Sequence, residues 1–389
     1  MKSKIDKKRK QDIIVILSMA FLLFGISFSC FLKKDNDFSE SERRILKQFP
    51  KVSVETIVSG TFMEEFEAYC LDQFPARDKF RSLKALTKYG LFFQKDNNRI
   101  YYSKGHLSKM EYPMNLAMLD YAAEKMDYIY ETYLKEQESK CYMAIVPDKN
   151  LFLAKENGYL SMDYETLFSY MENQITYADF IDLSPYLDIS DYYRTDTHWK
   201  QESIVDVAEA IKMSMGDDKE LSATQEEIEK RTKEAFKQYR IETLETPFKG
   251  VYYGQAALPV KPDTLHYLNS EILEACKVTS YDTGKPVETV IYNMDKATGK
   301  DAYEIFLSGT SALQVIENPY VSNGKELIVF RDSFGSSLIP LLVDDYWKIT
   351  VIDIRYVQSN VLGNFVDFQG QDTLFLYSTV VLNNSMSLR

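Results

Sequence analysis

Histidine and cysteine are scarce in this chain, which has only three histidines and four cysteines among 389 residues. The cysteines are widely spaced and form no Cys-x-x-Cys pair; they are Cys30, Cys70, Cys141 and Cys276. Cys30 lies in an apolar run that is a candidate membrane span, so only three cysteines remain for disulfide bonds outside it. Three cysteines cannot all pair. This argues against a disulfide framework, and three scattered histidines argue against a zinc site. We therefore expect no metal and no organic cofactor.

Basic residues are outnumbered, 46 against 58 acidic ones, which gives a net charge of −12. The first twelve residues carry six basic and two acidic groups, so residues 13–389 carry about −16. Such an acidic chain argues against binding to nucleic acid or anionic lipid, which need basic patches. It also favours a neutral glycan over an anionic polymer as substrate, although a local patch can override the net charge.

The longest uncharged apolar run extends over twenty residues, from Ile13 to Leu32. At about 1.5 Å per helical residue, this length matches the hydrocarbon core of a membrane. A cleaved signal peptide has a shorter apolar region and a small-x-small cleavage site, and the stretch from Ser27 to Ser29 has a bulky centre at Phe28. We expect an uncleaved transmembrane anchor, with residues 1–12 in the cytoplasm and the rest outside the cell.

Downstream of residue 98, segments with strand and helix patterns alternate. Cys141 to Val146 has the pattern of a buried strand, and it follows a strong helical pattern from Asn115 to Lys135. Strands separated by helices predict an α/β fold with a parallel, doubly wound sheet. Ligands of such sheets bind beyond the carboxyl ends of the strands, so functional residues are expected there.

Ser333 lies where a predicted strand meets the start of a helix. The apolar run Leu327–Phe330 leads into Arg331-Asp332-Ser333-Phe334-Gly335, and a second apolar run, Leu338–Val343, follows. A serine at such a corner projects its hydroxyl beyond the strand, beside backbone N–H groups of the helix start. Ser333 is therefore a candidate nucleophile, or else only a helix cap. Pro340 requires the helix to begin near Leu338 or to bend there.

His198 is the best candidate for a base, because it alone among the histidines has a carboxylate two positions away, Asp196. In an extended segment, residues i and i+2 face the same side, so Asp196 can accept a hydrogen bond from the imidazole. That bond would fix the tautomer and stabilise the imidazolium formed when His198 takes a proton from serine. The alternative is a structural Asp-His pair packed under Trp199.

The Asp-x-His-Trp element, followed far downstream by Asp-Ser-Phe-Gly after a strand, resembles the DHHW family. That family is related to the alginate O-acetylation proteins AlgX and AlgJ. The resemblance extends to four further segments, which are Ser41–Pro50, Asp72–Asp78, Val146–Lys149 and Ile352–Tyr356. In one position the chain departs from the pattern, because Thr197 stands where the family name places its first histidine.

The resemblance implies an SGNH-hydrolase-like α/β domain that is circularly permuted, since Asp-x-His precedes the serine. We accordingly expect six parts. They are a cytoplasmic tail (1–12), the anchor (13–32), a helical stalk (33–95), the first part of the SGNH-like domain (96–245, with a charged helical insertion near 217–240), an inserted β-rich lobe (246–310) and the second part with the serine (311–389). The lobe is inferred from turn signals and β-branched runs such as Val251–Tyr253.

Five further residues are candidates for contacting substrate or the oxyanion, namely Lys149, Trp199, Gly309, Arg355 and Tyr356. Lys149 follows a predicted strand, and Arg355 and Tyr356 follow another, so all three are expected at the rim that carries Ser333. Gly309 is in a turn that can bring a backbone amide to an oxyanion hole. Alternatively, these residues form surface ion pairs or a plain turn.

The sequence thus predicts an extracytoplasmic O-acyltransferase in which Ser333 attacks an acyl donor, His198 acts as general base and Asp196 orients it. By resemblance, the acyl group is acetyl and the acceptor a cell-surface or secreted polysaccharide. The resemblance also implies that a membrane-bound O-acyltransferase supplies the acyl donor. Two alternatives stay open: an esterase that removes acetyl groups from carbohydrate, and a non-catalytic glycan-binding or assembly protein with the same fold.

Overall fold

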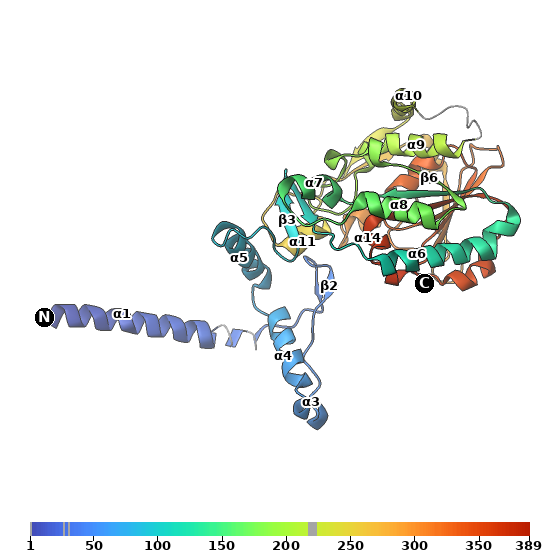
Figure 1. Ribbon diagram of the computed structural model, residues 1–389. Coiled ribbons are helices and arrows are strands. Elements are labelled where there is room, and N and C mark those ends of the chain that lie inside the picture. The colour runs from blue at the N-terminus through green and yellow to red at the C-terminus, as the bar shows by residue number, and fades with distance from the viewer. Residues whose placement is uncertain (1, 26–27, 30–31, 217–223) are drawn as a thin grey trace. The chain divides into compact units, whose positions relative to one another are not determined.

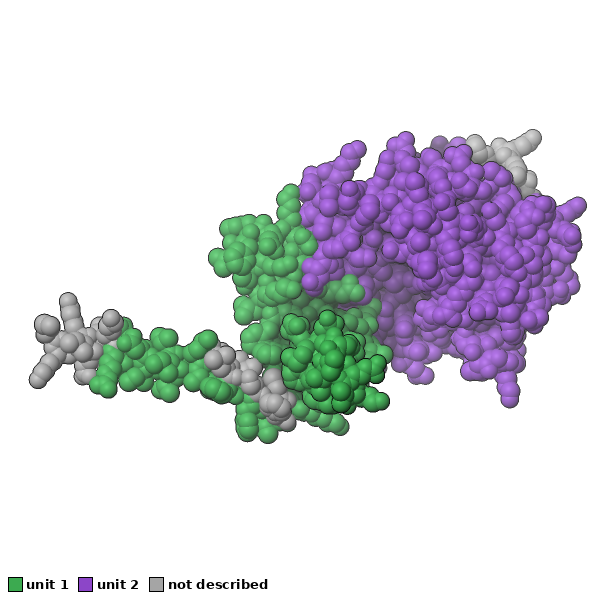
Figure 2. Space-filling view, turned by 60° about the horizontal axis from the view of Figure 1, so that its bottom comes forward, with its two compact units in different colours: residues 1–97, 254–259 green, residues 98–253, 260–389 purple. Residues whose placement is uncertain are grey.

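The computed structural model describes residues 2–25, 28–29, 32–216 and 224–389. These residues fall into two compact units, coloured separately in Figure 2. The first unit comprises residues 1–97 and 254–259, and the second comprises residues 98–253 and 260–389. The predicted serine, histidine and aspartate all belong to the second unit, so its sheet is described first.

An eight-stranded mixed sheet forms the centre of the second unit, in the order β10-β9-β11-β13-β12-β14-β5-β6. The five strands from β13 to β6 are parallel, whereas β11, β9 and β10 continue the sheet in antiparallel fashion. The strands are β5 Cys141–Val146, β6 Ala178–Ile181, β9 Lys277–Ser280, β10 Val287–Thr289, β11 Leu313–Glu317, β12 Glu326–Arg331, β13 Lys348–Ile352 and β14 Asp372–Ser378. An α/β fold is therefore confirmed, but the sheet is mixed rather than purely parallel.

The two faces of this sheet pack against two separate apolar cores, because alternate side chains of a strand point to opposite faces. In β5, Tyr142 and Ala144 contribute to one core and Met143 and Ile145 to the other. Helix α9 (Val205–Met215) covers the first face, and α6 (Leu116–Ile129) and α8 (Tyr164–Gln174) cover the second (Figure 1). Helices on both faces require strands that are apolar throughout, as β5 is.

The segment 246–310 does not form a β-rich lobe of its own. Its strands β9 and β10 extend the main sheet, and β8 (His266–Asn269) pairs with β7 (Arg240–Thr243) in a separate two-stranded sheet. Val251–Tyr253, expected to be extended, begins helix α11 (Val251–Ala256). Tertiary hydrogen bonds outweigh β propensity there: the N–H of Val251 donates to Asp196 and that of Tyr253 to the carbonyl of Thr195.

The remaining elements of the second unit are short. The strands β3 (Ile100–Ser103) and β4 (His106–Lys109) form an antiparallel hairpin. The other helices are α7 Lys149–Asn157, α10 Gln225–Phe236, α12 Glu271–Ala275, α13 Gly335–Leu338 and α14 Thr379–Leu382. Helix α10 lies in the predicted charged insertion, of which residues 217–223 are outside the described part of the chain.

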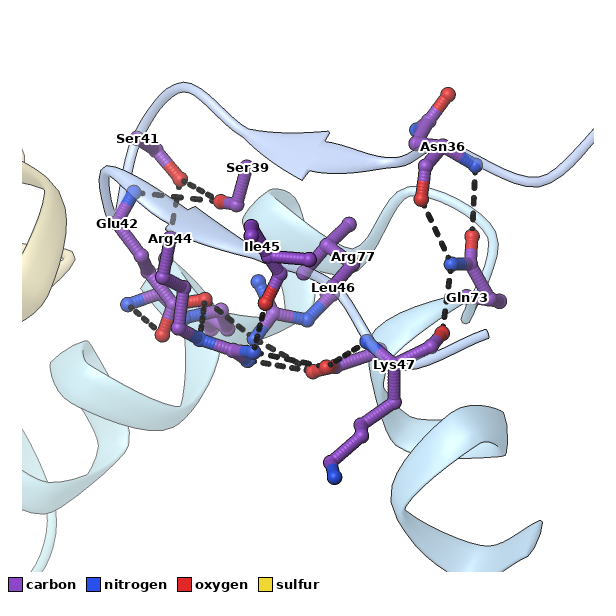
Figure 3. Close-up of polar contacts among 12 residues, drawn as sticks. Asn36, Ser39, Ser41, Glu42, Arg44, Ile45, Leu46, Lys47, Gln73 and Arg77 are labelled. Carbon is purple, nitrogen blue, oxygen red and sulfur yellow. Dashed lines mark hydrogen bonds and ion pairs between the residues drawn. The ribbon is translucent and has the colours of Figure 1, made fainter. Parts of the chain in front are cut away.

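The first unit contains the helices α1 Lys2–Ala20, α3 Val54–Val58, α4 Thr61–Asp72 and α5 Arg77–Gly90, and a hairpin of β1 (Phe38–Ser39) and β2 (Arg44–Ile45). The segments 41–50 and 72–78 meet here through ion pairs (Figure 3). Arg44 donates to the Asp72 carboxylate at 2.8 Å, and Arg77 pairs with Glu42. These ion pairs connect the hairpin to α4 and α5, in the region where a helical stalk was expected.

The predicted anchor at residues 13–32 is only partly described. Residues 13–20 continue α1, Phe21–Gly25 form a π-helix, and residues 26–27 and 30–31 lie outside the described residues. Within the described ranges, no helix is both long enough and apolar enough to cross a membrane.

Candidate active site

Ser333 occupies a tight turn at the carboxyl end of the central strand β12. The strand ends at Arg331, and α13 begins at Gly335 and passes into a 3-10 turn at Ile339. Pro340 is in the first turn of that segment, which accounts for the short helix, since proline cannot continue an α-helix interior. Gly335 allows the close packing of the turn, because a Cβ there would lie 2.8 Å from the Cβ of Arg331.

The segment with Asp196 and His198 is a narrow loop closed by backbone pairing. Tyr192 and Trp199 form an isolated antiparallel bridge, and the N–H of Tyr193 donates to the carbonyl of His198 at 3.1 Å. The loop between them is thereby held so that the side chains of Asp196 and His198 meet, as their i, i+2 spacing predicted.

Ser333, His198 and Asp196 form a continuous hydrogen-bonded chain. His198 Nε2 lies 2.8 Å from Ser333 Oγ, and His198 Nδ1 lies 2.6 Å from Asp196 Oδ1. Asp196 is fully buried and His198 is 7% exposed, whereas Ser333 is half-buried. Of these three groups, the Ser333 hydroxyl is thus the one that a reactant can reach, whereas the Asp196 carboxylate is shielded from water.

The carboxylate of Asp196 is fixed by three donors. Its Oδ1 accepts from the N–H of His198 at 3.1 Å as well as from the imidazole, and its Oδ2 accepts from the N–H of Val251 at 2.7 Å. The preceding residue, Thr195, is anchored to Asp263 through its N–H at 2.8 Å. Hydrogen bonds from three directions leave the carboxylate one orientation, the one that faces His198.

The backbone N–H of Ser333 is available to stabilise negative charge beside Oγ. No acceptor for it is found in the part of the chain that the structure describes, whereas the N–H of Phe334 donates to Asp332. A free backbone N–H next to a nucleophile is the usual first donor of an oxyanion hole.

Lys149 is at the expected rim, but it is buried instead of exposed to substrate. Only 2% of the residue is exposed, and its Nζ donates to the carbonyls of Tyr193 at 2.9 Å and Arg194 at 3.4 Å. The ammonium also lies 5.1 Å from the ring centre of Tyr252. Burial lowers the pKa of Lys149 to about 7, although nearby carboxylates, Asp196 first, oppose this. Lys149 therefore holds the Asp-x-His loop through its backbone carbonyls, and a substrate contact of this buried side chain stays a prediction.

Trp199 is also buried, with no exposed surface. Its indole N–H donates to Ser337 Oγ at 2.9 Å, and its ring meets that of Phe334 edge to face. The indole thus ties the loop of His198 to the helix that follows Ser333. The indole has no exposed surface in this structure, so a direct contact with substrate stays a prediction.

The backbone amide of Gly309 is engaged within its own turn, where it donates to the carbonyl of Phe306 at 3.0 Å. The turn needs glycine, because φ is +79° and a Cβ would lie 2.7 Å from Glu304. The carbonyl of Gly309 accepts from the buried Arg331. An oxyanion contact through this amide, as predicted, would require the bond to Phe306 to break.

Arg355 is held by an ion pair rather than directed at a substrate. Its Nε and Nη2 donate to the two oxygens of Asp353 at 2.9 and 2.6 Å. Tyr356 is 47% exposed, and its ring centre lies 5.5 Å from the Arg355 guanidinium. No contact joins either residue to the Ser333 chain in the described coordinates, so a substrate role for them stays a prediction.

Comparison with known proteins gives a family resemblance and a fold. The family model described as DHHW protein matches residues 167–352. Over this segment, which contains both the Asp-x-His and the Asp-Ser elements, the chain is similar to the DHHW family. A DHHW family protein from Eubacterium siraeum DSM 15702 overlays with a TM-score of 0.56 at 20% identity, covering 75% of this chain and 95% of that one.

PatB1 of Bacillus cereus, solved with a sulfonyl adduct, overlays with the same TM-score at 18% identity, covering 73% of this chain and 94% of that one. The O-acetyltransferase domain of Pseudomonas putida AlgJ overlays with a TM-score of 0.43 at 14% identity, covering 73% of this chain and 92% of that one. No curated protein sequence matches the chain. At these identities the structural likeness establishes the fold alone.

Thr197, at the position of the first histidine in the DHHW name, has a structural partner here. Its hydroxyl accepts a hydrogen bond from the hydroxyl of Tyr252 at 3.3 Å. Tyr252 in turn covers the ammonium of Lys149. Thr197 is therefore on the side of the loop that faces Lys149, and the imidazole that contacts Ser333 Oγ belongs to His198.

Tyr303 contacts His198 in the site, although the sequence did not identify it as a candidate. Its ring is stacked on the imidazole of His198, with centroids 3.9 Å apart and planes at 8°, and its hydroxyl lies 2.8 Å from Ser337 Oγ. No local pattern marks this tyrosine among the 28 of the chain. Only its neighbours in the fold identify it.

Proposed function

We propose that this chain is a serine-dependent O-acyltransferase that transfers an acyl group, acetyl by family resemblance, to a polysaccharide hydroxyl. The observation that carries the proposal is the chain of hydrogen bonds from Ser333 through His198 to the buried Asp196, at 2.8 and 2.6 Å. Such a chain raises the nucleophilicity of a serine that is otherwise a weak nucleophile at neutral pH.

In the first half-reaction, His198 Nε2 takes the proton of Ser333 Oγ while Oγ attacks the carbonyl carbon of the acyl donor. The carbonyl oxygen becomes negatively charged, and the N–H of Ser333 donates to it. The bond to the leaving group then breaks, and the leaving group takes the proton from His198. The products of this half are an acyl ester on Ser333 and a neutral imidazole.

In the second half-reaction, His198 Nε2 takes a proton from the acceptor hydroxyl, whose oxygen attacks the ester on Ser333. Collapse of the tetrahedral intermediate releases Ser333 Oγ, which recovers its proton from His198. With water as acceptor, the same steps give an esterase. The acidic Asp196 remains ionised throughout and stabilises each imidazolium.

The remaining parts of the proposal concern place and partners. We infer that residues 13–32 anchor the chain, with residues 1–12 in the cytoplasm and the α/β unit outside the cell. The acceptor is then a cell-surface or secreted polysaccharide, and a membrane-bound O-acyltransferase supplies the acyl donor. The apolar run and the basic residues before it support the location.

A sulfonyl fluoride tests for the nucleophile, and the sulfonyl adduct of PatB1 makes this reagent class a suitable choice. The wild-type chain should be labelled at Ser333, whereas Ser333→Ala and His198→Ala should not be. Ser336→Ala is the matched control, because Ser336 is a buried serine of the same helix start. An unlabelled wild-type chain would favour the non-catalytic glycan-binding alternative.

Transfer and hydrolysis are separated by adding an acceptor. With an activated acetyl ester as donor, the proposal expects an oligosaccharide to accelerate acetyl consumption and to appear as the O-acetylated product. Acetate release that is insensitive to oligosaccharide would identify an esterase instead.

A further inference from the structure

Helix α5 and the residues after it carry an apolar face that the described chain leaves uncovered. The side chains involved are Phe80, Leu83, Leu86, Leu91, Phe92 and Phe93, and all are exposed. Phe92 and Phe93 are 64% and 83% exposed. Exposed apolar residues are normal singly, but a contiguous group of this kind marks an interaction surface.

The opposite face of α5 is fixed within the first unit, so the orientation of the helix is determined there. Ala85 is fully buried, and Arg81 pairs with Glu42 and donates to the carbonyl of Gly254 at 2.8 Å. Arg77 also pairs with Glu42, at the amino-terminal end of the helix. The apolar face therefore points outward as a consequence of how α5 is held.

Lysines flank this apolar face on both sides. With about 3.6 residues per turn, Phe80, Leu83 and Thr87 share one stripe, Lys84 and Lys88 lie along one edge, and Lys79 lies along the other. One hollow on this surface is lined by both kinds of side chain, namely Phe80, Leu83, Lys84, Lys88 and Phe92. Within the described residues, neither Lys84 nor Lys88 has an ion-pair partner.

These unpaired lysines stand out in a chain whose net charge is −12. A partner that matches both the exposed apolar side chains and the flanking lysines must be apolar at its centre and anionic at its surface. A lipid leaflet with anionic headgroups has this chemistry: acyl chains receive the aromatic side chains, and phosphates lie at the level of the flanking ammonium groups. The apolar run 13–32 belongs to the same unit as α5, so both candidates for membrane contact lie in one part of the chain.

We propose that α5 and Leu91–Phe93 form an interfacial membrane-binding surface that prefers anionic lipid. This local patch overrides the expectation, drawn from net charge, that the chain avoids anionic lipid. The inference is independent of the acyl-transfer chemistry, since it uses none of Ser333, His198 and Asp196. It assigns α5 a role besides that of a stalk.

The test uses the full chain reconstituted into vesicles whose acyl chains carry bromine, which quenches tryptophan at short range. Phe92→Trp places a reporter on the proposed surface, and the unsubstituted chain, with its own two tryptophans, gives the background. The proposal expects the added fluorescence to be quenched, and more strongly in phosphatidylglycerol than in phosphatidylcholine. Absence of quenching in both lipids overturns it.

Charge reversal separates this surface from the proposed anchor at residues 13–32, which would keep every variant on the vesicle. Adding Lys84→Glu and Lys88→Glu to the reporter chain should reduce the quenched fraction in phosphatidylglycerol, with roughly a tenfold or greater loss in the local contact equilibrium. Lys230→Glu with Lys233→Glu on the exposed α10 changes net charge equally and should leave quenching unchanged. Equal effects of the two pairs, or none from either, would overturn the proposal.

Discussion

The imidazole of His198 lies face to face with the ring of Tyr303, at a centroid distance of 3.9 Å. Both side chains are buried, and Phe334 contacts the imidazole at a tilt, with centroids 4.9 Å apart. An aromatic face stabilises a cation placed above it, and more so where water is excluded. In the proposed mechanism, we therefore expect Tyr303 to act as a positioning residue that favours the imidazolium formed when His198 takes the proton of Ser333.

The ring and the hydroxyl of Tyr303 make separable contributions. Tyr303→Leu removes the aromatic face, and we expect kcat/KM for acyl transfer to fall by roughly 3- to 30-fold. Tyr303→Phe keeps the face and loses only the hydrogen bond to Ser337, which should cost about 0.5–1.5 kcal/mol of stability and leave the rate nearly unchanged. Equal rates for the two variants would show that the stacked ring has no part in the chemistry.

A second prediction concerns the charge of Lys149 near the Asp-x-His loop. At pH 6 the ammonium is present, since its pKa lies at about 7, and it opposes the formation of a second cation nearby. Lys149→Met removes this opposition, so protonation of the catalytic base becomes easier. The acidic limb of the kcat/KM profile should therefore move to higher pH, by a few tenths of a unit up to about one.

Lys155→Met is the control for that profile, because Lys155 is exposed on the same helix, α7. It should leave the limb where it is. A limb that moves to lower pH in Lys149→Met, or moves equally in both variants, would contradict the assignment of Lys149 to the support of Asp196.

The same lysine makes stability depend on pH. In the unfolded chain its pKa is about 10.4, above the folded value of about 7, so the unfolded state binds more protons between these limits. The free energy of unfolding therefore gains a contribution that rises with pH from about 7 to about 10. Denaturant titrations of wild type and Lys149→Met at several pH values should show a smaller rise for the variant across this window.

The strands of the central sheet could be predicted because their apolar character is continuous. Cys141–Val146 coincides with β5, and Leu327–Phe330 lies within β12. The antiparallel edge could not be predicted, because the pattern of a strand such as β11 contains no information on its direction. The same limit explains the expected lobe at 246–310, whose strands β9 and β10 had no visible partner in the sequence.

Within the site, local signals could single out Ser333, His198 and Asp196, since a strand-turn-helix corner and an i, i+2 spacing are both readable along the chain. The surroundings could not be predicted in this way. Lys149 and Trp199 are buried because their partners, Tyr193 and Ser337, come from remote segments. A charged or polar side chain next to a functional motif is exposed or buried according to contacts that no local spacing specifies.

The last prediction concerns Gly250, which backs directly onto Asp196. A Cβ at this position would lie 2.3 Å from the Cβ of Asp196 and 2.4 Å from its Cα, so alanine must push the two backbones apart. The N–H of Gly250 also donates to Thr195 Oγ1 at 3.0 Å, and that of the next residue donates to Asp196. We expect Gly250→Ala to displace the carboxylate from His198 and to lower kcat by on the order of a hundredfold.

The matched control is Gly90→Ala, where nothing lies within 4 Å of the added methyl group. It should change neither the rate nor the stability appreciably. Because a clash of this kind also costs stability, both variants are assayed below their unfolding transitions, and sulfonyl fluoride labelling of Ser333 is measured beside turnover. A folded Gly250→Ala chain that reacts at the wild-type rate would mean that the orientation of Asp196 does not govern the reactivity of Ser333.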